Sequence, residues 1–110
     1  MTRVRPVSGW TFAAEVLRAP VPVVVDFRSP PDPPELLVAL AAEYENRARV
    51  VTVDPAAEPE LARCVLTDAG PTILFFDDGR TVDAAPTSAS LADLREKLDR
   101  LVRPTPAAAG

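Results

Sequence analysis

The side chains that most often carry catalysis are scarce in this chain. Its 110 residues include one cysteine, Cys64, and no histidine. A single cysteine forms no intramolecular disulfide and no thiolate metal cluster. Without histidine, the commonest general base and the usual zinc ligands are also missing. We therefore expect no catalytic residues, no metal site and no other cofactor.

Cys64 itself has two interpretations. It falls within residues 58–66, where Pro59 and the acids around it predict the start of a short helix. A lone cysteine is usually a small core residue, whereas a reactive thiol needs exposure and a neighbouring positive charge. Arg63 is adjacent in sequence, but adjacent residues point to different sides of a helix. We favour a structural role, and a single-thiol redox enzyme that uses Cys64 remains an alternative.

One acidic residue, Asp26, lies in the most apolar stretch of the chain. Residues 23–27 read Val-Val-Val-Asp-Phe, a run that is apolar on both faces and predicts a central strand. The segment after it is rich in proline, which prevents the strand from continuing. Pro33 or Pro34 suits the first turn of a following helix, because a missing amide costs nothing there. The sequence therefore predicts a strand-to-helix junction at residues 28–34.

The elements that must position these residues follow from hydrophobic spacing and turn residues. The strands at 23–27 and 50–54 are joined through a helix, so they should be parallel with a right-handed crossover. The predicted elements are a helix at 10–18, a strand at 23–27, a helix from about residue 34 to 47, a strand at 50–54, a helix at 58–66, strands at 73–76 and 81–84, and a helix from about residue 90 to 102.

Particular residues are expected to begin, end or fill these elements. Ser8 or Thr11 can cap the first helix, and Ser90 with Asp93 resembles a capping box for the last one. Residues 77–80 predict a tight turn in which Gly79 supplies a positive φ. The chain's only tryptophan and only tyrosine are expected to be core or rim residues rather than binding platforms; they are Trp10 and Tyr44.

Length and composition indicate one globular domain, over residues 1–103, with a disordered tail at 104–110. Hydrophobic residues make up 47% of the chain and charged residues 25%, as in ordinary globular proteins. The net charge of -4, with acids and bases interspersed, argues against nucleic acid as a partner. No apolar run has the length of a signal peptide or a bilayer span, so we expect no membrane association and a cytoplasmic location.

The order of the elements and five local segments resemble the thioredoxin family. Residues 23–27 resemble the strand before the family's redox motif, and residues 40–44 resemble the end of the helix after it. Residues 51–54 and 58–62 resemble the next strand and helix. Residues 70–79 resemble the family's cis-proline loop with its strand and turn. The resemblance runs from about Phe12 to Val102. It implies an α/β, thioredoxin-like fold, in which a central mixed sheet of four to five strands is flanked by helices on both faces.

The resemblance fails at the family's Trp-Cys-Gly-Pro-Cys motif, which would fall around residues 30–34. Neither cysteine has a counterpart in this chain. Thiol-disulfide exchange needs an attacking thiolate and a resolving partner, so the ordinary family reaction should be absent. Asp26 matches the buried acid that helps to move protons in the family. Without a thiol beside it, we interpret Asp26 as structural.

The remaining resemblance points to a surface that binds polypeptide. Pro71 is the best match to the family's cis-proline, and a cis bond would leave the backbone of Gly70 as a short edge that pairs with an extended peptide. The alternative is that Pro71 merely starts a strand. Arg28 stands where the family often has tryptophan, which makes this surface charged. The candidate partner-binding residues are Arg28, Ser29, Pro30, Pro31, Asp32, Gly70, Pro71 and Thr72.

Three functions remain open at this point. We favour a redox-inactive thioredoxin-like protein that binds a protein or peptide partner, as an accessory or chaperone module, through residues 28–35 and 70–72. The second is a redox enzyme that uses Cys64 alone, which the lack of histidine and of a resolving cysteine weakens. The third is a structural or oligomerising domain of a larger assembly, with the proline-rich segment as a rigid docking element. A homodimer of the chain is one form that such an assembly can take.

Overall fold

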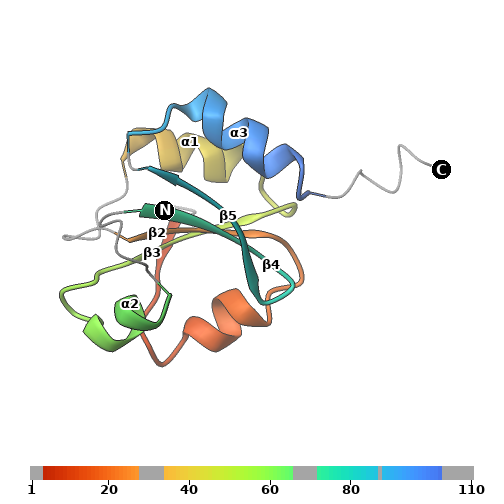
Figure 1. Ribbon diagram of the computed structural model, residues 1–110. Coiled ribbons are helices and arrows are strands. Elements are labelled where there is room, and N and C mark those ends of the chain that lie inside the picture. Colours follow the sequence, from red (N-terminus) through yellow and green to blue (C-terminus); the bar gives the residue numbers. More distant parts are fainter. Residues whose placement is uncertain (1–3, 28–33, 66–71, 87, 103–110) are drawn as a thin grey trace.

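The computed structural model describes residues 4–27, 34–65, 72–86 and 88–102. Five strands form one mixed sheet in the order β1-β3-β2-β4-β5 (Figure 1). β1 and β2 both run parallel to β3, whereas β4 is antiparallel to β2, and β5 is antiparallel to β4. The strands are β1 (Val4–Pro6), β2 (Val23–Phe27), β3 (Arg49–Val53), β4 (Thr72–Asp77) and β5 (Arg80–Pro86). The predicted mixed α/β sheet is thus confirmed, with β2 at its centre.

Helices cover both faces of this sheet, as predicted (Figure 1). α1 (Glu35–Glu43) and α3 (Leu91–Asp99) lie on one face. α2 (Pro59–Val65) and the π-helical segment η1 (Ala13–Leu17) lie on the other. Within the described ranges, no helix has the length and apolar character that crossing a bilayer requires.

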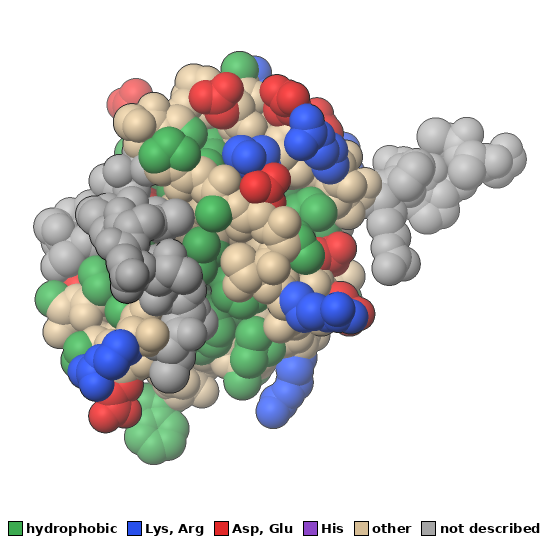
Figure 2. Space-filling model, in the orientation of Figure 1, with side chains coloured by type: hydrophobic (Ala, Val, Ile, Leu, Met, Phe, Trp, Pro, Cys, Tyr) green, Lys and Arg blue, Asp and Glu red, His purple; other side chains and the backbone are tan. Residues whose placement is uncertain are grey.

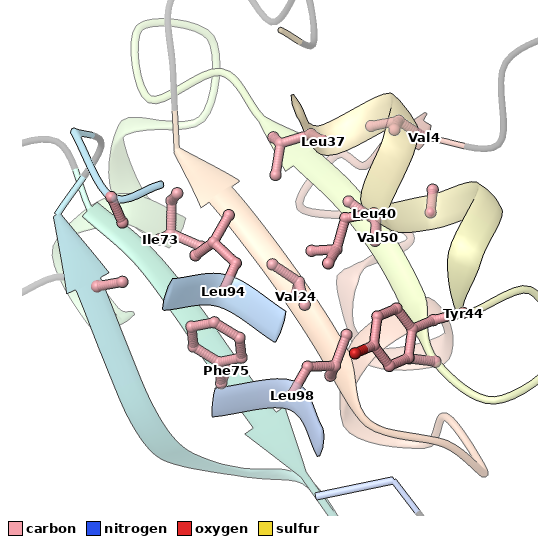
Figure 3. Packing of buried hydrophobic residues seen from close by; sticks show 14 residues of the cluster. Val4, Val24, Leu37, Leu40, Tyr44, Val50, Ile73, Phe75, Leu94 and Leu98 are labelled. Atoms are coloured by element: carbon pink, nitrogen blue, oxygen red, sulfur yellow. The ribbon is translucent and has the colours of Figure 1, made fainter. Parts of the chain in front are cut away.

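The first hydrophobic core, the α1/α3 cluster, fills the space between these two helices and the sheet. Leucines from both helices point onto the strands beneath them, and in Figure 3 they surround the side chains of β2, β3 and β4. Each fully buried leucine stabilises the fold by about 1.5 to 3 kcal/mol. The labelled members are Val4, Val24, Leu37, Leu40, Tyr44, Val50, Ile73, Phe75, Leu94 and Leu98.

The second core, the α2/η1 cluster, lies on the opposite face of the sheet. Successive side chains of a strand point to opposite faces, so β2 contributes Val24 to the first cluster and Val25 to the second. All five residues of β2 are buried. The predicted strand that is apolar on both faces is therefore confirmed. The members of the second cluster are Val7, Phe12, Val16, Val23, Val25, Phe27, Val51, Val53, Ala62, Leu74 and Phe76.

The turn between β4 and β5 has the conformation that the sequence predicts. Asp78 and Gly79 adopt positive φ angles of 55° and 78°. Two consecutive positive φ values are typical of the tight turns that match the twist of a hairpin. Gly79 also lies close to η1, because a Cβ at this position would be 3.1 Å from the carbonyl oxygen of Leu17.

The capping box predicted for the last helix is present. The hydroxyl of Ser90 accepts a hydrogen bond from the amide of Asp93 at 3.1 Å, and the Asp93 carboxylate accepts one from the amide of Ser90 at 3.3 Å. The helix predicted from about residue 34 begins at Glu35, with Pro34 immediately before it. The carbonyl of Pro34 accepts hydrogen bonds from the amides of Leu37 and Val38. Both helix starts therefore follow from their local residues.

Two elements differ from the sequence predictions. The helix expected at 10–18 is a π-helical segment of five residues, Ala13–Leu17, and the amide of Arg18 bonds to the carbonyl of Ala13 five residues earlier. Its N-cap residue is Phe12, which makes no side-chain capping bond. The hydroxyls of Ser8 and Thr11, predicted to cap this helix, instead bond to each other or to the backbone of Ser8. The strand β1 was not predicted at all, because three residues are too few to show a period. It lies at the edge of the sheet, where Pro6 is tolerated.

Candidate functional site

In the sequence, the predicted partner-binding residues directly follow β2 or lead into β4. β2 ends at Phe27 and β4 begins at Thr72, and the register of these two antiparallel neighbours pairs Asp26 with Ile73. Phe27 and Thr72 therefore lie at the same end of adjacent strands. Thr72 is the only predicted partner-binding residue whose backbone is described. The others lie outside the described residues, as does the predicted cis bond: Arg28, Ser29, Pro30, Pro31, Asp32, Gly70 and Pro71.

Asp26 is the residue before the last one of β2, and the alternation along the strand puts its side chain on the face that α1 and α3 cover. Its side chain is 0% exposed, and its neighbours in register are Thr52 on β3 and Ile73 on β4. Thr52 is also buried, so two polar residues lie next to each other at an otherwise apolar level of the sheet. The burial predicted for Asp26 is confirmed. Its interpretation as purely structural stays a prediction.

The only cysteine is not at this junction. Cys64 lies in the last turn of α2, on the face of the sheet opposite to α1 and α3. Its side chain is outside the described part of the structure. The segment that joins β2 to α1, where the family motif would fall, contains no sulfur. The only cysteine of the chain therefore belongs to α2 and not to the segment between β2 and α1.

Tyr44 and Trp10 have opposite environments. Tyr44 is 4% exposed and belongs to the α1/α3 cluster, which confirms a core position. Trp10 is 96% exposed, so its predicted core or rim position is wrong. Its spacing from the buried Phe12 and Val16 is two and six residues, which does not place it on their side of a helix. This spacing is the signal that could have revealed the exposed indole.

A groove of about 590 Å³ adjoins Trp10 on the side of the molecule where α2 begins. The sequence analysis did not identify it, because it forms from two segments that are about 50 residues apart in the chain. It is lined by Gly9, Trp10, Ala57, Glu58, Pro59, Glu60 and Leu61. A second hollow of about 360 Å³ lies beside it at the carboxyl ends of β1 and β3, and Asp54 and Glu58 contribute its charges.

The opposite end of the sheet contains a cavity of about 430 Å³ with both signs of charge. Arg49 donates to the carboxylate of Glu15 at 3.1 Å and to its carbonyl at 2.8 Å. Arg5 lies 3.5 Å from the same carboxylate. Glu15 and the lining residue Glu45 together offset these two arginines, so the cavity has no net positive charge that would attract an anion.

The edge of the sheet formed by β5 has features that oppose pairing with another strand. The ladder between β4 and β5 is irregular at Phe75 and Phe76. The carboxylate of Asp83 accepts the amide of Ala84 at 2.8 Å and pairs with Lys97 at 3.1 Å. Bulges and charges of this kind oppose edge-to-edge association. The homodimer considered in the sequence analysis therefore gains no support from β5 and stays a prediction.

Charges elsewhere on the surface are mixed. Figure 2 shows basic and acidic side chains next to one another, without a broad field of one sign on the face in view. Glu43 of α1 accepts a hydrogen bond from Arg95 of α3 at 2.7 Å, and this bond holds the pKa of Glu43 below its ordinary value. Within the described residues, no group of three or more cysteine, aspartate or glutamate side chains is arranged to bind a metal ion.

Comparison with known proteins gives a consistent set of relatives, although no protein-family model matches the chain. Thioredoxin 1 of Synechococcus elongatus is 32% identical over 99 residues, which cover 86% of this chain and 92% of the relative. Thioredoxin 1 of a Nostoc species is 31% identical over 105 residues, or 91% of this chain and 98% of the relative. The rice thioredoxin-like protein CITRX, chloroplastic, is 42% identical over 72 residues, which are 61% of this chain and 38% of the relative.

Proposed function

The chain belongs to the thioredoxin-like family, and on that premise we propose that it is a redox-inactive member that binds a protein partner, as an accessory or chaperone module. The observation that carries this proposal is the single cysteine of the whole chain, on α2 instead of between β2 and α1. A cytoplasmic location is part of the same proposal.

The chemistry of disulfide reduction explains why one cysteine is insufficient. A thiolate attacks a substrate disulfide and forms a mixed disulfide, and one substrate sulfur leaves as a thiolate. A second thiolate must then attack the mixed disulfide to release the reduced substrate and leave an oxidised pair on the protein. Cys64 has no second cysteine to perform this step. The chain therefore lacks the atoms for the dithiol cycle, and we assign it no catalytic residue.

The preserved scaffold supports a binding role. The two hydrophobic clusters pack against β2 from both faces of the sheet, so the carboxyl end of this strand is held in a fixed position. β4 begins next to that end. A binding surface formed by the segment after β2 and the segment before β4 needs no thiol to hold an extended peptide. We propose that residues 28–32 and 70–72 form this surface.

A disulfide-reduction assay tests the redox part of the proposal. Insulin and dithiothreitol are incubated with the wild-type protein, with Cys64→Ser, or with a two-cysteine thioredoxin as a positive control. We expect both forms of this chain to match the rate of dithiothreitol alone. Turnover by the wild type that disappears in Cys64→Ser would overturn redox inactivity and favour a single-thiol enzyme.

Partner capture tests the binding part. The tagged protein is used to capture partners from the native host, beside Arg28→Glu, Pro71→Ala and the control Arg100→Glu. Arg100 is exposed at the end of α3, so its reversal gives the same change in net charge as Arg28→Glu on another element. We expect Arg28→Glu and Pro71→Ala to lose a partner that the control retains. A partner retained by all three variants would refute this surface.

A further inference from the structure

The groove next to Trp10 combines an exposed aromatic side chain with acidic walls. Trp10 is the only tryptophan of the chain, and it is almost fully exposed. Tryptophan presents a large apolar surface and is strongly enriched among the residues that dominate binding at protein interfaces. An indole left in water at the border of a groove is therefore a candidate anchor for a ligand.

The backbone that carries Trp10 is held in place on both sides of the residue. The amide of Gly9 donates to the carboxylate of Glu58 at 2.8 Å, which ties this turn to the start of α2. The amide of Phe12 donates to the carbonyl of Ser8 at 2.9 Å. The ring of Phe12 is buried and meets Phe76 edge-on, with 5.7 Å between ring centroids. The exposed indole therefore stands on an ordered turn, which lowers the entropy cost of binding.

Gly9 and the end of the Glu58 side chain are in close contact. A Cβ at position 9 would lie 2.8 Å from the Oε1 atom of Glu58, which is closer than real Cβ contacts allow. A larger residue at position 9 would therefore displace the end of the Glu58 side chain from its present place. The contact with Gly9 fixes Glu58 at the wall of the groove, where one carboxylate oxygen is engaged by the amide of Gly9.

The charged residues that line this groove are all acidic. Glu58 and Glu60 contribute carboxylates, and no lysine or arginine is among the described lining residues. Glu60 is exposed, and within the described part of the chain it forms no ion pair. Arg63, on the same helix, does not line the groove. A ligand with a positive charge would complement this wall.

We propose that this groove binds an arginine side chain presented by an extended segment of a partner protein. A guanidinium group stacks on an indole face and pairs with a carboxylate in a planar geometry, and its methylene stem packs against apolar surface. Trp10, Glu60 and Leu61 supply these three kinds of surface within one groove. Lysine offers the charge without the planar stacking, so it binds more weakly.

This inference goes beyond the proposed function, because none of the lining residues belongs to segments 28–32 or 70–72. A negative result for the groove therefore does not refute the partner-binding surface proposed at residues 28–32 and 70–72, and a negative result for that surface does not refute the groove. The chain's single tryptophan provides a direct probe, because the protein has one indole N–H signal in an ¹H–¹⁵N NMR spectrum. The signals of Gly9, Ala57 and Leu61 report on the walls of the same groove.

The test is a titration of the ¹⁵N-labelled protein with a short blocked peptide that has a central arginine. The same peptide with citrulline, which keeps the shape and loses the charge, is the matched control. Peptide is added to about 10 mM, because a single side chain supplies only weak affinity. We expect saturable shifts of the Trp10 indole and of the groove amides with arginine, and none with citrulline.

Three variants assign the effect to the groove. Trp10→Ala should abolish the shifts of the groove amides, and Trp10→Phe should leave a weaker response because the smaller ring still offers a face. Glu60→Gln should weaken binding about threefold. Glu96→Gln removes the same charge from an exposed site on α3 and should leave binding unchanged.

Several results would overturn the proposal. One is the absence of shifts at the highest peptide concentration, and another is an equal response to citrulline. Equal affinity of Glu60→Gln and the wild type would refute the role of the acidic wall. Shifts of the indole signal that depend on protein concentration, without any peptide, would show that a second copy of the chain occupies the groove instead.

Discussion

Replacement of Tyr44 by phenylalanine removes one hydroxyl group from the joint between α1 and α3. The tyrosine follows the last residue of α1, and its ring lies in the α1/α3 cluster beside Leu98 (Figure 3). The hydroxyl donates a hydrogen bond to the carboxylate of Asp99 on α3. Phenylalanine fills the same space, so Tyr44→Phe tests the hydrogen bond and the titration of the phenol without creating a cavity.

At neutral pH the expected loss of stability is modest. A hydrogen bond to a charged group contributes about 1.5 to 3 kcal/mol when its loss leaves the partner buried. Asp99 is exposed, so water replaces the lost donor, and the expected loss is nearer to 1 kcal/mol. For a domain of this length, such a change lowers the melting temperature by about 4 °C.

At alkaline pH the order of stability should reverse. Burial, and then the hydrogen bond to Asp99, raise the pKa of Tyr44 from 10.0 to about 12. Because the folded state holds the proton more tightly than the unfolded state, this stabilisation is complete below pH 10 and is lost between pH 10 and about 12. A difference of two pKa units corresponds to roughly 3 kcal/mol. Tyr44→Phe has no such loss, so the curves of unfolding free energy against pH for the wild type and Tyr44→Phe should cross at about pH 11.

Two measurements check this reasoning. Tyr44 is the chain's only tyrosine, so tyrosinate absorbance reports its ionisation directly. Urea denaturation of both proteins from pH 7 to 11.5 gives the difference in free energy of unfolding. A phenol that titrates near pH 10 in the folded protein would refute the argument. So would a constant difference in stability across the whole pH range.

Two further predictions concern a turn and a surface ion pair. Gly79→Ala should lower the free energy of unfolding by about 1 to 2 kcal/mol, because φ is positive there and the new Cβ would lie 3.1 Å from the carbonyl oxygen of Leu17; an unchanged urea midpoint would contradict this. Arg95→Ala should return the pKa of Glu43 upward to its ordinary value, because the bond from Arg95 is what lowers it. Carboxyl chemical shifts during an NMR titration measure that change, and an unaltered Glu43 curve would count against the pairing.

The sheet and its helices were predictable where a single physical signal was strong. The five apolar residues 23–27 identify a buried strand, and Asp78 with Gly79 identifies a hairpin turn. Ser90 with Asp93 identifies the start of α3. Each of these signals is local, so neighbouring residues in the sequence are sufficient to read it.

The errors arose where the structure depends on contacts between distant segments. β1 is recognisable only through its pairing with β3, and η1 differs from an ordinary helix by one residue in the spacing of its hydrogen bonds. The exposed position of Trp10 is the exception, because its spacing of two and six residues from the buried Phe12 and Val16 was a local signal. Of the residues predicted to bind a partner, only Thr72 has a described backbone, so the prediction of that surface rests on the family resemblance and on the strands that flank it.

The position of Asp26 links the two parts of this interpretation. Retaining a carboxylate at a fully buried position opposes folding unless its surroundings compensate for the lost hydration. In this chain the acid lies between Thr52 and Ile73, one residue before β2 ends. It therefore lies at the end of β2 from which one of the segments proposed to bind a partner continues in the sequence. If Asp26 now serves only the fold, Asp26→Asn should leave partner capture intact, whereas loss of the partner in this variant, with its melting transition preserved, would show that the acid still shapes the binding surface.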